Sequence, residues 1–278
     1  MKNVKIPSLV MENNEKIPIL GFGTYFLNLD DVYSSVLCAL ESGYRMLDTA
    51  KWYNNEEIVG RAIMDSKIPR EELFITSKIE DLGYEGTING VIDTLKKFNT
   101  EYLDLVLIHW PTNNVLSTYK ALEFLANKGI IKSIGISNFH QELCEELLKV
   151  CKIKPQVNQI ETHIYFQEVK MNNYLKSKNI LHESWAPFAE GYMNMLYDDT
   201  LKEIAKKYNK STAQIILRFF VQKDIIVIPK STNKDHIKEN LEIFDFELDL
   251  EDIKKIEKLD RKQQYSTFPP NMKVETYY

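Results

Sequence analysis

Cysteine is scarce in this chain of 278 residues, and no pair of cysteines has the CxxC spacing. The three present are Cys38, Cys144 and Cys151. The first two lie in helix-like patterns and the third follows one, so we expect reduced thiols, as in a cytoplasmic protein. A thiol nucleophile stays open as the less favoured interpretation.

Long apolar runs and an excess of basic charge are also missing. No apolar stretch approaches the roughly 18 residues that span a membrane, and residues 1–7 lack the apolar region of a signal peptide. The chain has 35 Lys and Arg against 40 Asp and Glu, and its net charge is −5. We therefore expect neither a membrane anchor nor a nucleic-acid partner.

What the sequence does contain is an alternation of short β-like runs with amphipathic helical patterns. The runs lie at 20–25, 44–48, 73–78, 103–109, 131–137, 156–160, 180–185 and 225–228. Helical patterns lie between most of them, at 30–42, 54–65, 86–98, 115–128, 139–150, 167–178 and 199–208. This alternation predicts an α/β fold, a (β/α)₈ TIM barrel. No low-complexity linker interrupts it, so residues 1–278 are predicted to form a single domain.

Three further segments are predicted around the barrel. The pattern of residues 8–19 predicts two short strands joined by a polar turn, a hairpin that could cover the bottom opening of the barrel. Extra helices are predicted at 211–222 and 249–259. The competing layout is a doubly wound open sheet with a phosphate-binding turn after its first strand. Gly21 and Gly23 are followed there by no third glycine, so that layout is disfavoured.

Four reactive side chains lie at or just beyond the ends of predicted strands: Asp48, Tyr53, Lys78 and His109. In such barrels the carboxyl ends of the strands carry the chemistry, so the four should meet at one rim. Tyrosine has an ordinary pKa of about 10. We expect Lys78 to lower the pKa of Tyr53 and Asp48 to keep Lys78 charged, which makes Tyr53 a tuned general acid.

Polar residues also end the later strands. Ser137 and Asn138 end the fifth strand, Gln159 lies on the sixth, and Lys230 and Ser231 follow the eighth. Each residue taken alone has a purely structural alternative: Asp48 with Lys78 as a plain buried ion pair, or His109 as a core imidazole. Their gathering at one rim favours a functional site.

Sequence motifs over about 200 residues carry a resemblance to a known family. They are Gly43-Tyr44-Arg45-Met46-Leu47-Asp48-Thr49-Ala50, Tyr53-Asn54-Asn55-Glu56, Leu107-Ile108-His109-Trp110-Pro111, Gly135-Ile136-Ser137-Asn138-Phe139, Asn158-Gln159-Ile160-Glu161, Trp185-Ala186-Pro187 and Ile228-Pro229-Lys230-Ser231. In their order and spacing, the chain resembles an aldo-keto reductase from end to end. It is similar to the smaller, prokaryotic-type members that reduce diketo acids and dicarbonyls such as glyoxal.

The resemblance implies a metal-free, monomeric, NAD(P)H-dependent enzyme that reduces a carbonyl by hydride transfer. Tyr53 would give the proton, Lys78 and Asp48 would tune it, and His109 would orient the carbonyl oxygen. Residues similar to the family's cofactor contacts are Thr24, Asp48, Ser137, Asn138, Gln159, Trp185, Pro187, Phe188, Lys230, Ser231, Asn233, His236, Glu239 and Asn240.

One of these positions departs from the family pattern. His236 stands where members commonly have an Arg that meets the 2′-phosphate of NADPH. His is mostly neutral at pH 7 and lacks the bidentate fork. We therefore predict NADPH preference, weaker than usual and with NADH possible. The alternative is that His236 is a solvent-exposed helix residue.

The substrate is predicted less closely than the reaction. Tyr25, Trp52, His109, Trp110 and the tail around Phe268 and Tyr277-Tyr278 would line the pocket. Short loops suggest an open pocket for a small aldehyde, a dicarbonyl or a keto sugar. Two rivals remain: a non-catalytic nicotinamide-binding sensor or interaction module, and a metal-dependent hydrolase. The hydrolase is disfavoured because no His-x-His pair follows the first strand and Lys78 would repel a cation.

Overall fold

The computed structural model describes residues 5–25, 27–80, 82–112 and 114–266. At its centre is an eight-stranded parallel sheet whose strands follow one another in space as in the sequence. They are β3 (Phe22–Gly23), β4 (Met46–Asp48), β5 (Phe74–Ile79), β6 (Leu103–Ile108), β7 (Ile131–Ser137), β8 (Val157–Glu161), β9 (Leu181–Trp185) and β10 (Ile226–Val227). Leu20 forms a parallel bridge with Val227 in β10 and closes the sheet. The predicted barrel is confirmed.

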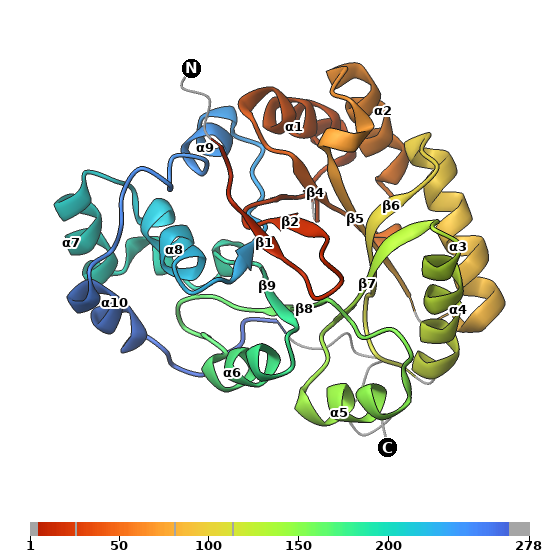
Figure 1. Ribbon diagram of the computed structural model, residues 1–278. Helices are drawn as coiled ribbons and strands as arrows, with labels where there is room; N and C mark the ends of the chain where they lie inside the picture. Colours follow the sequence, from red (N-terminus) through yellow and green to blue (C-terminus); the bar gives the residue numbers. More distant parts are fainter. Residues whose placement is uncertain (1–4, 26, 81, 113, 267–278) are drawn as a thin grey trace.

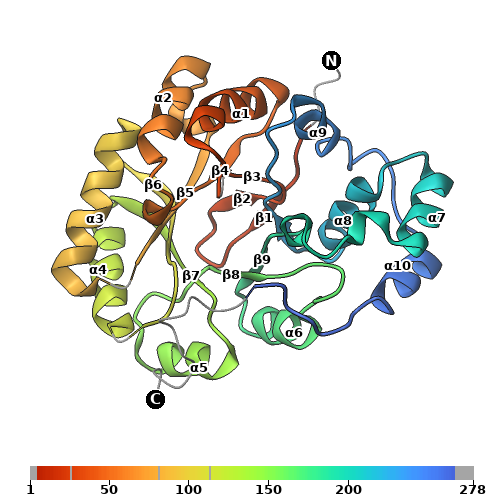
Figure 2. The same ribbon diagram turned by 180° about the vertical axis from the view of Figure 1, so that it is seen from behind.

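Helices surround the strands on the outside (Figures 1 and 2). One helix follows each of the first six strands: α1 (Leu29–Ser42), α2 (Glu56–Ser66), α3 (Gly83–Phe98), α4 (Val115–Asn127), α5 (Gln141–Val150) and α6 (Val169–Ser177). Both α7 (Asp199–Tyr208) and α8 (Thr212–Val221) follow β9, whereas α9 (Lys234–Glu239) and α10 (Leu250–Glu257) follow β10. The predicted extra helices are α8 and α10. In the described ranges, no helix is long and apolar enough to cross a membrane.

Local sequence sets where several helices begin and end. The Ser211 side chain accepts from the Gln214 amide at the start of α8, and the Gln214 side chain caps Ser211 in return. Asp249 caps α10 through a single bond, by accepting from the Asp252 amide. At the end of α1, Gly43 adopts φ 118°, a conformation that glycine reaches without strain. These caps explain why these helix boundaries could be predicted from the sequence.

An antiparallel hairpin of β1 (Ser8–Val10) and β2 (Lys16–Pro18) lies across the barrel (Figure 1). Its turn is fastened to the amino-terminal ends of the strands by Asn13. The backbone N–H of Asn13 donates to Gln156 Oε1 at 3.0 Å, and its side chain donates to Ser133 Oγ at 3.0 Å. Ile17, in β2, is fully buried. The hairpin therefore covers the bottom of the barrel, as predicted, and leaves the opposite rim open.

Candidate active site

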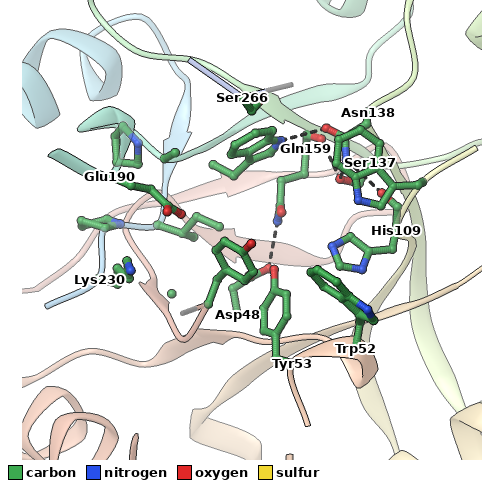
Figure 3. Close-up of a pocket in the computed structure, with 18 of the residues that line it drawn as sticks. Asp48, Trp52, Tyr53, His109, Ser137, Asn138, Gln159, Glu190, Lys230 and Ser266 are labelled. Atoms are coloured by element: carbon green, nitrogen blue, oxygen red, sulfur yellow. Dashed lines mark hydrogen bonds between the residues drawn. The ribbon is translucent and has the colours of Figure 1, made fainter. Parts of the chain in front are cut away.

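A cavity of about 580 Å³ opens at the carboxyl ends of the strands (Figure 3). Its lining includes most of the residues predicted for the site: Tyr25, Asp48, Trp52, Tyr53, His109, Trp110, Ser137, Asn138, Gln159, Trp185, Pro187, Phe188 and Lys230. The rim that the sequence predicted is therefore a single concave site, built from strands far apart in the chain.

Lys78 is buried outside the cavity lining and joins two predicted catalytic side chains that do line it, Asp48 and Tyr53. Its Nζ donates to Asp48 Oδ1 at 2.5 Å, to the Thr49 carbonyl at 3.0 Å and to the Tyr53 hydroxyl oxygen at 3.2 Å. The Lys78 and Asp48 side chains are 1% and 3% exposed. The second oxygen of Asp48 accepts from Gln159 Nε2 at 2.8 Å. Because Lys78 is the donor to Tyr53, the phenol keeps its own proton for another acceptor.

The charges in this group decide the protonation states. Burial lowers the pKa of Lys78, but the Asp48 carboxylate and the Tyr53 oxygen raise it more, so Lys78 stays charged as predicted. Burial raises the pKa of Tyr53, and Lys78 lowers it without cancelling that effect. The result is a pKa of about 12. The prediction that Lys78 brings the pKa of Tyr53 below its ordinary value is therefore wrong in its net direction, because removal from water outweighs the ammonium charge.

Thr24 supports the strand end that carries Asp48. Its hydroxyl and its backbone N–H donate to the Asp48 carbonyl at 3.1 Å and 3.0 Å. Asn55 continues the link, because its side chain donates to the Thr24 carbonyl and accepts from the Thr49 hydroxyl. Thr24 is fully buried. It was predicted as a cofactor contact, and the structure places it beneath the cavity instead of on its lining.

His109 enters the cavity from the residue after β6. Its backbone N–H donates to the Ile79 carbonyl at 2.8 Å, and its Nδ1 lies 3.6 Å from Glu80 Oε1. The ring stands edge-on to Tyr53 with centroids 5.6 Å apart. Burial lowers the pKa of His109, Lys78 adds to that effect, and Glu80 opposes it without reversing it. The imidazole is therefore neutral at pH 7 and has one N–H to donate.

Asn138 ties the later strand ends together. It adopts φ 65°, a conformation that Asn tolerates better than most residues. Its Nδ2 donates to the His109 carbonyl at 2.9 Å and to Ser137 Oγ at 3.0 Å, while its Oδ1 accepts from Trp185 Nε1 at 2.9 Å. Ser137 Oγ in turn donates to the Gln159 carbonyl at 2.9 Å. The side chains at this end of the cavity are therefore held in place by one another (Figure 3).

The far end of the cavity carries a positive charge. Lys230 lines it beside Glu190, and burial lowers the pKa of Lys230 while Glu190 raises it. Beyond Lys230 the chain turns into α9, where Asn233 Oδ1 accepts from the Asp235 amide at 2.8 Å. The other predicted cofactor residues of this segment lie outside the cavity lining: Ser231, Asn233, His236, Glu239 and Asn240. His236 is exposed on α9.

Several lining residues escaped prediction: Gly23, Glu80, Ala186, Glu190, Ile228, Pro229, Tyr265 and Ser266. Glu80 directly follows β5, so the strand-end rule could have found it. Tyr265 could not be found in this way, because it reaches the cavity through a backbone hydrogen bond to Glu161 at 2.7 Å from a distant part of the chain. The predicted pocket residues Phe268, Tyr277 and Tyr278 lie outside the described residues.

The part of the chain that the structure describes holds no cluster of three or more His, Cys, Asp or Glu side chains that could bind a metal ion. The site instead combines a phenol, an ammonium, a carboxylate and a neutral imidazole. Such a set can hold and donate a proton next to an oxygen that gains negative charge.

Comparison with known proteins agrees with this chemistry. The aldo/keto reductase family model matches residues 19–261. Glyoxal reductase of Bacillus subtilis is 42% identical over 266 residues, which cover 94% of this chain and 96% of that protein. Methylglyoxal reductase DkgA of Escherichia coli K12 is 34% identical over 262 residues, 93% of this chain and 95% of that protein.

Solved structures agree as well. An aldo-keto reductase from a Medee basin deep-sea metagenome library superposes with a TM-score of 0.93 at 42% identity, covering 96% of this chain and 100% of that one. Bombyx mori aldo-keto reductase in complex with NADP gives 0.91 at 30% identity, covering 95% and 96%. The chain therefore belongs to the aldo/keto reductase family and is an oxidoreductase that acts on carbonyl groups.

Proposed function

We propose that this protein uses NADPH to reduce a small aldehyde or ketone to the alcohol, with Tyr53 as the proton donor. One observation carries the proposal. The Lys78 ammonium bridges the buried Asp48 carboxylate and the Tyr53 oxygen at 2.5 Å and 3.2 Å, and both of these partners line the open cavity. Because Lys78 donates to the Tyr53 oxygen, the phenol can give its own proton to a substrate oxygen.

The polarity of the cavity supports a nicotinamide dinucleotide as the cofactor. Lys230 at one end suits a phosphate group, and the hydroxyl and amide groups of Ser137, Asn138 and Gln159 at the other suit a carboxamide. The Trp185 ring lines the wall between them and offers a face for stacking. The bound cofactor would supply a hydride to the carbonyl carbon. We infer NADPH with NADH possible, because the exposed His236 has no guanidinium fork for the 2′-phosphate.

The protonation states fit reduction. A pKa of about 12 keeps Tyr53 protonated at pH 7. An alkoxide is about as basic as hydroxide, whose conjugate acid has a pKa of about 15.7, so Tyr53 can still give up its proton to it. The neutral His109 would donate its N–H to the carbonyl oxygen and orient it. Lys78 would then stabilise the phenolate that proton transfer leaves behind.

The cavity walls support small or aromatic substrates. Tyr25 and Trp52 stack with centroids 6.3 Å apart over one side, and Trp110 lines the other. Relatives are named for glyoxal and methylglyoxal, which supports a dicarbonyl, with keto sugars and aromatic aldehydes as further candidates.

The test is NADPH consumption with methylglyoxal and a nitrobenzaldehyde, together with NADPH binding followed by fluorescence. Tyr53→Phe should lower kcat by about 10² to 10⁴ while the Kd for NADPH stays within about twofold, because the phenol oxygen is replaced without changing the ring. Tyr197→Phe is the matched control, since Tyr197 is 71% exposed. If the wild type binds NADPH and turns over no carbonyl, the non-catalytic sensor is the correct function.

A further inference from the structure

Glu183 is a buried carboxyl group to which the reaction above assigns no role. It lies in the middle of β9, paired in register with Gln159 on β8 and with Ile226 on β10. Residues in register on parallel strands present their side chains to the same face. Gln159 points into the barrel, where it reaches Asp48 (Figure 3), so Glu183 also faces the interior. It is 0% exposed, and neither of its carboxyl oxygens has a hydrogen-bond partner among the described residues.

The charges in this layer do not balance if Glu183 is ionised. Among the described residues, Lys78 is the cation that acts on Glu183. Its ammonium already donates to Asp48, the Thr49 carbonyl and Tyr53. An ionised Glu183 would be a second carboxylate with no counter-ion, and an unpaired buried charge is so unfavourable that the group takes up a proton instead. The two neighbouring strands provide no counter-ion at this position, because they place the uncharged side chains of Gln159 and Ile226 next to Glu183.

The electrostatics point the same way. Burial raises the pKa of Glu183 to about 8, and the Asp48 carboxylate contributes to the rise. Lys78 and the Gln159 amide oppose it, although Gln159 does not reach hydrogen-bond geometry with Glu183. Among the described residues, Asp48 and Lys78 are the charged groups that act on it. His182, its neighbour on β9, points away to Thr162 and Asn172.

We propose that Glu183 is a protonated, neutral carboxyl group inside the barrel, and that it positions Gln159 and Asp48 beneath the reacting centre. A neutral carboxyl has one O–H to donate, and the Gln159 amide and the Asp48 carboxylate both offer acceptor oxygens. Loss of that proton would place a second negative charge behind Asp48. That charge would oppose the negative charge that develops on the substrate oxygen, so reduction falls at alkaline pH. Only this catalytic consequence rests on the proposed function.

The first test measures the proton without any substrate. Urea unfolding is followed from pH 5 to 9 for the wild type, Glu183→Gln and the exposed control Glu57→Gln. A carboxyl whose pKa is raised on folding gives stability that is lost as the pH rises. The unfolding constant of the wild type relative to Glu183→Gln should therefore rise by up to about tenfold per pH unit between about pH 5 and 8, and level off above. A ratio that does not change with pH overturns the proposal. The unfolding constant of the wild type relative to the control Glu57→Gln should not change with pH.

The second test measures the consequence for the reaction. Wild-type kcat for methylglyoxal should fall by about tenfold or more from pH 7 to an alkaline plateau, and Glu183→Gln should shift that fall to higher pH. Glu183→Leu should lose activity that Glu183→Gln restores, because an amide can still donate to the acceptors. If both variants keep the wild-type pH profile, Glu183 does not position the site. If no carbonyl is turned over by any of the proteins, the proposed function fails while the unfolding result still decides the state of Glu183.

Discussion

Lys78→Met removes a buried cation and leaves Asp48 without the ammonium that it pairs with at 2.5 Å. Removing one member of a buried ion pair typically costs about 3–5 kcal/mol. Asp48 limits this loss by taking up a proton. At pH 7, protonating a carboxyl whose unfolded pKa is about 3.9 costs about 4 kcal/mol, and at pH 5 about 1.5 kcal/mol. The free energy of unfolding should therefore fall by about 3–4 kcal/mol at pH 7 and by less than half of that at pH 5.

The sign of this pH dependence follows from the direction of the pKa change. In the variant the pKa of Asp48 is raised on folding, so the folded state is favoured at low pH and loses stability as the pH rises. Urea unfolding at pH 5, 6 and 7 measures it. Lys202→Met is the control, because Lys202 pairs with Asp199 on the surface, where the two side chains are 51% and 97% exposed, and should cost at most about 1 kcal/mol. A loss for Lys78→Met below about 1 kcal/mol, or one that is equal at every pH, would refute the reasoning.

Three more predictions concern other parts of the site. Because burial lowers the pKa of His109, kcat should show no loss as the pH drops from 8 to the ordinary histidine pKa of about 6.5. A loss with falling pH in that range that His109→Gln abolishes would contradict this. His236→Arg should raise the ratio of kcat/KM for NADPH over NADH by about tenfold, since a guanidinium adds a charge-assisted contact to the 2′-phosphate. Equal kcat/KM values of the wild type for the two cofactors would refute the predicted NADPH preference. Glu161 accepts from the Tyr265 amide at 2.7 Å and from Ser266 Oγ. Glu161→Gln should therefore lower the free energy of unfolding in urea by about 1–3 kcal/mol and raise KM for the carbonyl. An unchanged KM would show that Tyr265 does not form part of the pocket wall.

Several features could be predicted from the sequence because their causes are local. Strand and helix limits follow the apolar period and the caps, as Ser211 and Asp249 show. The meeting of Asp48, Lys78 and His109 was predictable because parallel strands in register bring their carboxyl ends to one face. By contrast, the six residues of α9 (Lys234–Glu239) are too short to show a helical period. That residues 1–278 form a single domain, and that the protein is monomeric and cytoplasmic, stay predictions.

The order of the elements and the kinds of side chain at the rim therefore follow from the amino-acid sequence alone, since both depend on residues close together in the chain. How far those side chains are removed from water, and which distant groups face them, depends on the packing of the whole fold. This is why the pKa of Tyr53 rises to about 12 although Lys78 lies beside it. It is also why Tyr265 reaches Glu161 across a separation of 104 residues and why Glu183 is buried within reach of the Asp48 charge. Desolvation and long-range contact are properties of the packed molecule, and no short stretch of sequence encodes them.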